Sequence, residues 1–156
     1  MKVFRFYPVR QAKKAFEEWG FDHEAFGTAF SIFYNKHFAD ESQYTKNYYI
    51  GIRIDNRQHD GYGAYQLGGS IFLGRLLTKE TSDFEFQRQL FATLMHELMH
   101  WIQYNFYKWS DEDILAGDDD PNCLAEKMCE KFEKQTKFVI RLYKAITSIK
   151  YHGEYQ

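Results

Sequence analysis

The feature that most constrains the fold is the run of residues 91–106, with the sequence FATLMHELMHWIQYNF. Its apolar side chains recur at intervals of three and four residues, which predicts an amphipathic α-helix. The apolar face consists of Leu90, Phe91, Leu94, Met95, Leu98, Ile102 and Phe106. The opposite face carries His96 and His100 among the polar residues Gln89, Thr93, Gln103, Tyr104 and Tyr107. We therefore expect one face to pack against a core and the other to line a site.

His96, Glu97 and His100 form an HExxH motif within this helix. Histidines four residues apart lie about 40° apart around a helix axis and about 6 Å along it, so both rings can bind one cation. Neutral imidazole nitrogen suits zinc, which lowers the pKa of a bound water from about 15.7 towards about 7. The motif predicts a zinc site with His96 and His100 as ligands and Glu97 as the general base. A solvated histidine face without metal is the alternative.

Composition limits the classes of protein that this chain can belong to. Its 156 residues suit one domain, and the 44% hydrophobic and 19% aromatic content predicts a folded core. The net charge of -2 and the pI near 6.3 give no electrostatic attraction to nucleic acid or to an anionic membrane. No apolar run is long enough to span a bilayer, and the first residues lack the apolar stretch of a signal peptide.

The chain has two cysteines, Cys123 and Cys129. Six residues apart on a helix, they point about 120° away from each other, so we expect no disulfide between them. A reducing, cytoplasmic location is the expectation that follows.

The first forty residues predict a strand over residues 2–7 and a helix over residues 9–19 that ends at Gly20. Residues 21–38 are ambiguous, because Asp22 can cap a second helix but the aromatic residues that follow also suit a strand.

Strand signals return in residues 48–54, which are rich in aromatic and β-branched side chains, and again in residues 64–77. The histidine helix begins near Asp83 and ends around residue 108. Residues 110–121 are acidic and turn-like, and Asp120 with Pro121 predicts the start of a long helix that reaches residue 149, before a loose tail over residues 150–156. These elements predict a single α+β domain, in which a small, mixed, twisted sheet packs on the histidine helix and the long C-terminal helix.

A hydrolytic zinc site needs a third protein ligand and one open position. Glu126 is the favoured candidate, because it lies in the first turns of the C-terminal helix beside the small residues Ala125 and Cys129. The alternatives are Glu130, the Asp118–Asp120 cluster, His152, Cys123 and Cys129, although thiolates are more typical of structural zinc sites. A row of carboxylates on a solvated helix face is the competing interpretation of the glutamates.

The segment HELMHWIQ with a downstream glutamate-bearing helix resembles the gluzincin metallopeptidases, in particular their compact forms, the minigluzincins. The resemblance covers roughly residues 48–133 and implies a zincin-like fold. It implies that His96, His100 and Glu126 bind zinc, that Glu97 is the general base and that Glu130 supports a histidine. It also implies that an upper-rim strand pairs with extended substrate, a part that Ser70, Ile71, Phe72 and Leu73 can play. Small, aromatic-rich members of this kind resemble proteins of phages and mobile elements.

The expected function is therefore a zinc-dependent peptidase that cleaves peptide or protein substrates, as an endopeptidase rather than an exopeptidase. One alternative is a regulatory or binding protein of zincin fold that shows little general proteolysis and acts on one partner. Another is hydrolysis of amide bonds in a non-protein substrate such as cell-wall peptide. We expect neither a nucleic-acid partner nor a membrane partner.

Overall fold

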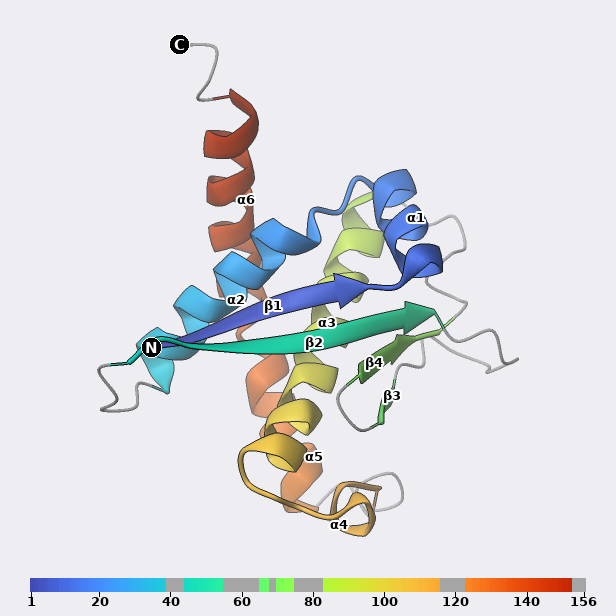
Figure 1. The fold of residues 1–156 in the computed structure, drawn as a ribbon, viewed down its shortest axis with the longest axis vertical. Coiled ribbons are helices and arrows are strands. Elements are labelled where there is room, and N and C mark those ends of the chain that lie inside the picture. Colours follow the sequence, from blue (N-terminus) through green and yellow to red (C-terminus); the bar gives the residue numbers. More distant parts are fainter. Residues whose placement is uncertain (39–43, 55–64, 68–69, 75–82, 116–122, 153–156) are drawn as a thin grey trace. The chain divides into compact units, whose positions relative to one another are not determined.

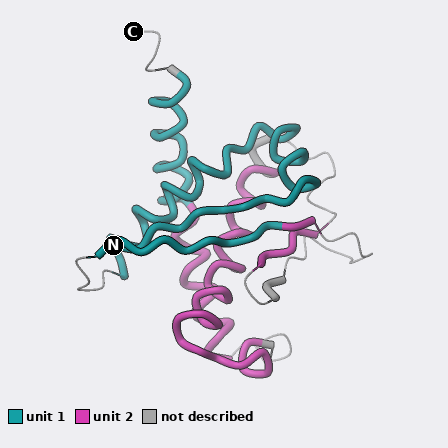
Figure 2. Tube along the Cα trace, in the orientation of Figure 1, with its two compact units in different colours: residues 1–52, 137–156 teal, residues 53–136 magenta. Residues whose placement is uncertain are grey.

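A computed structural model of the chain describes residues 1–38, 44–54, 65–67, 70–74, 83–115 and 123–152 (Figure 1). It has the α+β composition that the sequence predicts. The contacts within the chain group it into two compact units (Figure 2), and the expectation of a single domain stays a prediction. Unit 1 comprises residues 1–52 and 137–156, and unit 2 comprises residues 53–136. Among the described residues, no helix has both the length and the apolar character needed to cross a membrane.

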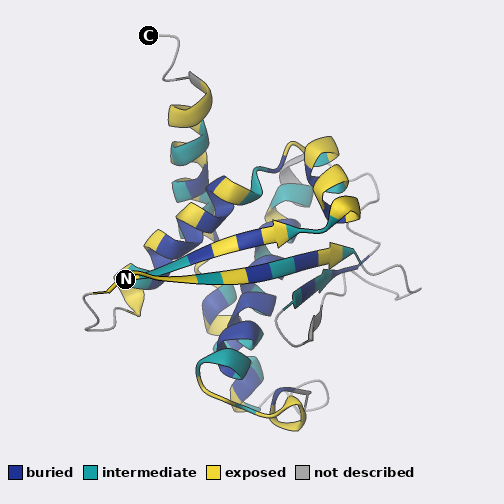
Figure 3. Cartoon of the chain, in the orientation of Figure 1, coloured by how far each residue is buried: buried dark blue, intermediate teal, exposed yellow. Residues whose placement is uncertain are grey.

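In unit 1, strand β1 (Lys2–Pro8) pairs in parallel with strand β2 (Lys46–Ile54), so that Phe6 lies opposite Ile50. Buried residues alternate with more exposed ones along much of these strands, as the strand period of two predicts when one face is covered (Figure 3). The buried side chains of the pair are Phe4, Phe6, Ile50 and Ile52. This confirms the strands predicted at residues 2–7 and 48–54.

Helix α1 (Arg10–Trp19) ends at Gly20, which has the left-handed φ of 67° that glycine adopts without strain. Helix α2 (His23–His37) resolves the ambiguity of residues 21–38 in favour of a helix. Asp22 caps it by accepting a hydrogen bond of 3.0 Å from the Ala25 N–H. The aromatic side chains that also suited a strand recur at helical spacing, so α2 buries them on one face.

Helix α2 lies against β1 and binds its backbone. The Ser31 hydroxyl accepts from the Phe4 N–H at 2.8 Å, and the Asn35 side chain bonds both the N–H and the carbonyl of Lys2. Gly27 allows this close approach, because a Cβ at that position would lie 2.9 Å from the Phe4 carbonyl oxygen. Side-chain hydrogen bonds thus satisfy β1 backbone groups that do not pair with β2.

Helix α6 (Thr136–His152) completes unit 1. The Tyr143 hydroxyl accepts from the Asp22 N–H at 3.0 Å, and the Asp22 carboxylate accepts from Lys150 at 2.9 Å and from Tyr151 at 2.7 Å. The loose tail that we expected from residue 150 is therefore wrong for Lys150 and Tyr151, which are helical and bonded to Asp22. Residues 153–156 lie outside the described part of the chain.

In unit 2, strand β3 (Tyr65–Leu67) pairs antiparallel with strand β4 (Ser70–Leu73). Helix α3 (Asp83–Asn105) carries the HExxH motif and confirms the predicted amphipathic helix. Six of the seven residues of its predicted apolar face are buried, namely Leu90, Phe91, Leu94, Met95, Leu98 and Ile102. Helix α4 (Asp111–Leu115) interrupts the stretch that we expected to be turns. Helix α5 (Leu124–Glu133) packs against α3.

The single long C-terminal helix predicted from Pro121 to residue 149 is wrong, because the structure divides it into α5 and α6. Cys123, just before α5, has an extended backbone, and Asp120 and Pro121 lie outside the described residues. The break falls at Lys134 and Gln135, where the Thr136 hydroxyl donates to the Glu133 carbonyl oxygen. There the Gln135 N–H bonds the Phe132 carbonyl oxygen, three residues back, instead of the carbonyl four residues back that an α-helix uses.

Candidate metal centre

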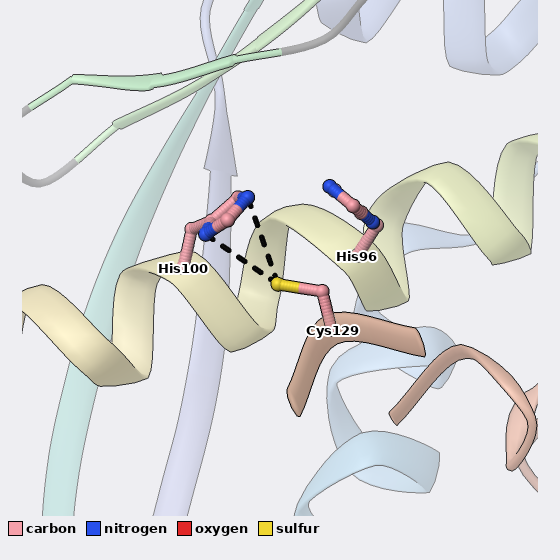
Figure 4. A group of neighbouring side chains, drawn as sticks. All are labelled: His96, His100 and Cys129. Atoms are coloured by element: carbon pink, nitrogen blue, oxygen red, sulfur yellow. Dashed lines mark hydrogen bonds between the residues drawn. The ribbon is translucent and has the colours of Figure 1, made fainter. Parts of the chain in front are cut away.

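Helix α3 brings the two motif histidines together on its less buried face. The ring centroids of His96 and His100 lie 4.8 Å apart, with the planes at 82° (Figure 4). Both side chains are half-buried, while the apolar residues on the other side of α3 anchor the helix in the core. The predicted pairing of the two rings is therefore present, and they lie side by side as ligands of one cation require.

Helix α5 adds a third donor atom, the thiol of Cys129. Its Sγ lies 3.4 Å from Nδ1 and 3.6 Å from Nε2 of His100 (Figure 4). Among the described residues, His96, His100 and Cys129 form the one group of three such side chains whose ligand atoms all lie within 4.8 Å of one another. Cys129 is fully buried and Cys123 is half-buried, and both are free thiols, which confirms that no disulfide joins them.

Gln103 supplies a hydrogen-bond partner for one ring nitrogen of His100. Its side chain is fully buried, and its Nε2 donates to the Ala125 carbonyl oxygen at 3.1 Å. The amide oxygen is thereby turned towards His100, where it lies 2.9 Å from Nδ1 and accepts the ring N–H. In the tautomer with its proton on Nδ1, His100 keeps the lone pair of Nε2 available to a metal.

Glu133 plays the equivalent part for His96. Its Oε2 lies 3.3 Å from His96 Nδ1, which leaves Nε2 as the ligand atom. Burial alone would lower the pKa of His96, but the hydrogen bond that its ring donates to Glu133 and the charges of Glu97, Glu133 and Glu126 raise that pKa above its ordinary value. The site is thus set up to hold positive charge. We expected this supporting role for Glu130, which is exposed instead.

Glu97 is 4% exposed, although it is the acidic residue of the motif. Its charge acts on both His96 and Cys129, raising the pKa of each, so the carboxylate lies close to the cluster. A buried carboxylate beside two possible metal ligands is placed to exchange a proton with a water bound there.

Glu126, the expected third ligand, lies at the edge of the cluster. Its Oε1 is 4.0 Å from His96 Nε2, and a quarter of its side chain is exposed. Burial raises the pKa of the Cys129 thiol, as do the charges of Glu126, Glu97 and Glu133, so that thiol stays protonated unless a cation is present. Glu126, Cys129 and Glu133 are three and four residues apart, and therefore share one side of α5.

The other predicted site residues do not join this cluster. Ser70, Ile71, Phe72 and Leu73, which we expected to pair with substrate, form β4, whose antiparallel partner within unit 2 is β3. Ile71 and Leu73 are buried in the core. His152 ends α6 in unit 1, and its side chain is not described. The Asp118–Asp120 cluster lies outside the described residues.

Sequence reasoning missed Gln103 and Glu133 as partners of the histidines. Gln103 is three residues after His100, on the same side of α3, and this spacing is the signal that pairs them. Glu133 is seven residues after Glu126, so two helical turns on the same side of α5 connect them.

The cluster fits a zinc ion. With Zn–N of about 2.1 Å and Zn–S of about 2.3 Å, tetrahedral ligands are separated by about 3.6 Å from nitrogen to sulfur. The distance from Cys129 Sγ to His100 Nε2 is 3.6 Å. Comparisons of the chain with protein-family models, with curated proteins and with solved structures give no match.

Proposed function

We propose that this chain is a zinc-dependent peptidase, in which His96 and His100 hold the metal and Glu97 is the general base. The observation that carries the proposal is that each histidine Nδ1 contacts a side-chain oxygen, from Glu133 and from Gln103 respectively. Each Nε2 is then available for a metal, as in zinc sites whose histidines are fixed by a partner on the other ring nitrogen. Zinc, when bound, supplies Lewis acidity that activates water and polarises a carbonyl.

The carboxylate of Glu97 has two tasks in this proposal. It accepts a proton from the attacking water, and it then delivers a proton to the nitrogen that leaves when the peptide bond breaks. Its burial beside His96 supports this role, because a carboxylate shielded from bulk solvent exchanges protons with the site. Gln103 and Glu133 keep the two rings in the required tautomer and orientation throughout.

The proposal includes a zincin-like fold for unit 2, in which α3 supplies the motif and α5 supplies a third ligand from Glu126 or Cys129. The resemblance to gluzincins supports the helix order, with an HExxH helix followed by a helix that carries glutamates. The proposed substrate is an extended peptide or protein segment. Strand β3 ends the strand order, so its backbone is where such a segment can add to the sheet.

The test is the substitution Glu97→Gln in the full chain, with zinc content and cleavage of a mixed peptide library measured together. We expect cleavage to fall by about 10²–10⁴-fold, the range for loss of a general base, while zinc stays near one ion per chain. Glu112→Gln makes the same chemical change at an exposed position of α4 and should leave both unchanged. Wild-type protein that holds zinc but cleaves no peptide would contradict the proposal.

A further inference from the structure

We infer that Cys129, rather than Glu126, is the third protein ligand of the metal centre. The inference rests on the zinc site proposed above and changes its ligand set from two histidines and a glutamate to two histidines and a cysteine.

The Cys129 sulfur lies closer to one motif histidine, His100, than the Glu126 carboxylate lies to the other, His96. The Cys129 Sγ is 3.6 Å from His100 Nε2, near the separation of about 3.6 Å that tetrahedral zinc imposes on nitrogen and sulfur ligands, and 3.4 Å from His100 Nδ1. For nitrogen and carboxylate oxygen ligands, the corresponding separation is about 3.4 Å. Glu126 Oε1 lies 4.0 Å from His96 Nε2, which is longer than this value. Cys129, unlike Glu126, belongs to the group of described side chains whose ligand atoms all lie within 4.8 Å of one another.

Packing of α5 supports the same assignment. The buried residues of α5 are Ala125, Cys129 and Phe132, spaced four and three residues apart. Cys129 is the middle one, so the side of α5 that packs against α3 also fixes the position of the sulfur. Glu126 is one residue after Ala125, on the flank of that buried side, and a quarter of its side chain is exposed. Its carboxylate therefore remains available to a substrate or to water.

The chemistry of the donor set is consistent with a catalytic zinc centre. Zinc binds thiolate and imidazole together, and three protein ligands leave a fourth position open. A thiolate also discriminates against magnesium and calcium, which prefer oxygen ligands. The competing interpretation is that Cys129 is a small apolar residue that fills space between the helices.

X-ray absorption at the zinc edge of the wild-type chain tests the ligand set without any substitution. We expect one sulfur at about 2.3 Å together with nitrogen or oxygen at about 2.0–2.1 Å. A coordination shell of nitrogen and oxygen alone would overturn the inference and leave the proposed peptidase in place. Failure of the folded chain to bind zinc would remove both.

Cobalt substitution adds a second, independent measurement. The wild type should show the near-ultraviolet absorption of a thiolate bound to Co²⁺, and Cys129→Ser should lose it, together with more than about 100-fold in zinc affinity. That loss exceeds the 10–100-fold typical of residues that only support a ligand. Cys123→Ser, which changes the chain's other cysteine, and Glu126→Gln should keep the absorption. Its persistence in Cys129→Ser, or its loss in Glu126→Gln, would overturn the inference.

The two conclusions can fail separately. If sulfur coordination is found but Glu97→Gln cleaves peptides as fast as the wild type, the proposed function fails and the ligand set stands. Circular dichroism of each variant establishes that loss of metal does not reflect loss of the fold.

Discussion

The two units differ in what they bury. Among the described residues, unit 1 buries aromatic and aliphatic side chains and a single polar one, Ser31, whereas unit 2 buries four polar side chains. These are Thr93, Glu97, Gln103 and Thr136. A buried polar group destabilises a fold unless it is hydrogen-bonded. Ser31 serves the backbone of β1, while Gln103 serves His100. The buried polar side chain of unit 1 thus serves its backbone, whereas Gln103 in unit 2 contacts a histidine of the proposed metal site.

The two units also differ in net charge. Unit 1 has eleven Lys and Arg against seven Asp and Glu, a net charge of +4, and unit 2 has nine against fifteen, a net charge of -6. The overall charge of -2 hides this difference. An acidic unit raises the local concentration of cations, which favours metal binding by unit 2.

The largest expected effect on stability belongs to the aromatic core of unit 1. Phe30→Ala should lower the free energy of unfolding by about 3–5 kcal/mol, because Phe30 is fully buried and its ring packs against Phe4 at 4.9 Å. Denaturant unfolding measures this, and the cobalt spectrum of the folded variant should match that of the wild type. Ile32→Ala, at an exposed position of the same helix, should change stability by less than about 0.5 kcal/mol. Equal losses of unfolding free energy in Phe30→Ala and Ile32→Ala would contradict the conclusion that the buried aromatic core stabilises unit 1.

Gln103→Ala, in contrast to Phe30→Ala, should mainly affect zinc binding. Without the amide, His100 loses the acceptor that fixes its tautomer, so zinc affinity should fall by about 10–100-fold. Competition with a chromophoric chelator measures this. Gln89→Ala removes a glutamine from the same side of α3 and should leave the affinity unchanged. If both variants bind zinc as the wild type does, Gln103 has only a packing role.

Asp22 stabilises unit 1, and its contribution to stability depends on pH. Burial alone would raise its pKa, but hydrogen bonds from the Ala25 N–H, Lys150 and Tyr151 lower it from 3.8 to about 2. Because the folded-state pKa is depressed, this stabilisation is complete above about pH 4 and is lost as the pH falls towards 2. Asp22→Ala should cost about 1–2 kcal/mol at neutral pH.

Asp22→Asn separates the cap from the charge. Asparagine caps helices as well as aspartate does, so this variant should retain part of the stability but lose the dependence on pH between 4 and 2. Thermal unfolding across that range measures the difference from the wild type. An unaltered pH profile in Asp22→Asn would show that other carboxylates cause it.

The smallest expected effect is on the pKa of His96 in the metal-free protein. Nuclear magnetic resonance titration should give His96 a pKa above the ordinary 6.5, because the Glu133 hydrogen bond and the surrounding carboxylates outweigh burial. Glu133→Gln should lower that pKa, whereas Glu130→Gln, at an exposed position of the same helix, should change it less. The reverse ranking would restore Glu130 to the role that the sequence predicted.

The sequence predicted the elements whose signals are local. The period of α3 and its HExxH motif identified the paired histidines, and Gly20 identified the end of α1. The break after Glu133 was not predictable, because Lys134, Gln135 and Thr136 include neither glycine nor proline.

The identity of the third ligand in the proposed site was likewise not predictable from the sequence. Glu126 and Cys129 lie only about 60° apart around α5, so the helical period alone does not choose between them. The choice depends on how α5 is rotated against α3, which the burial of Ala125 and Phe132 sets. Both candidates were considered from the sequence, and only tertiary packing separates them.

The bond from Gln103 to the Ala125 carbonyl links the proposed metal centre to the packing of two helices. Because that carbonyl belongs to α5, the group that orients the Gln103 amide is in place only after α5 has docked on α3. In the proposed zinc site, α5 would also supply the third ligand. The complete donor set would then exist only in the folded chain, so that zinc binding and the docking of α5 would stabilise each other.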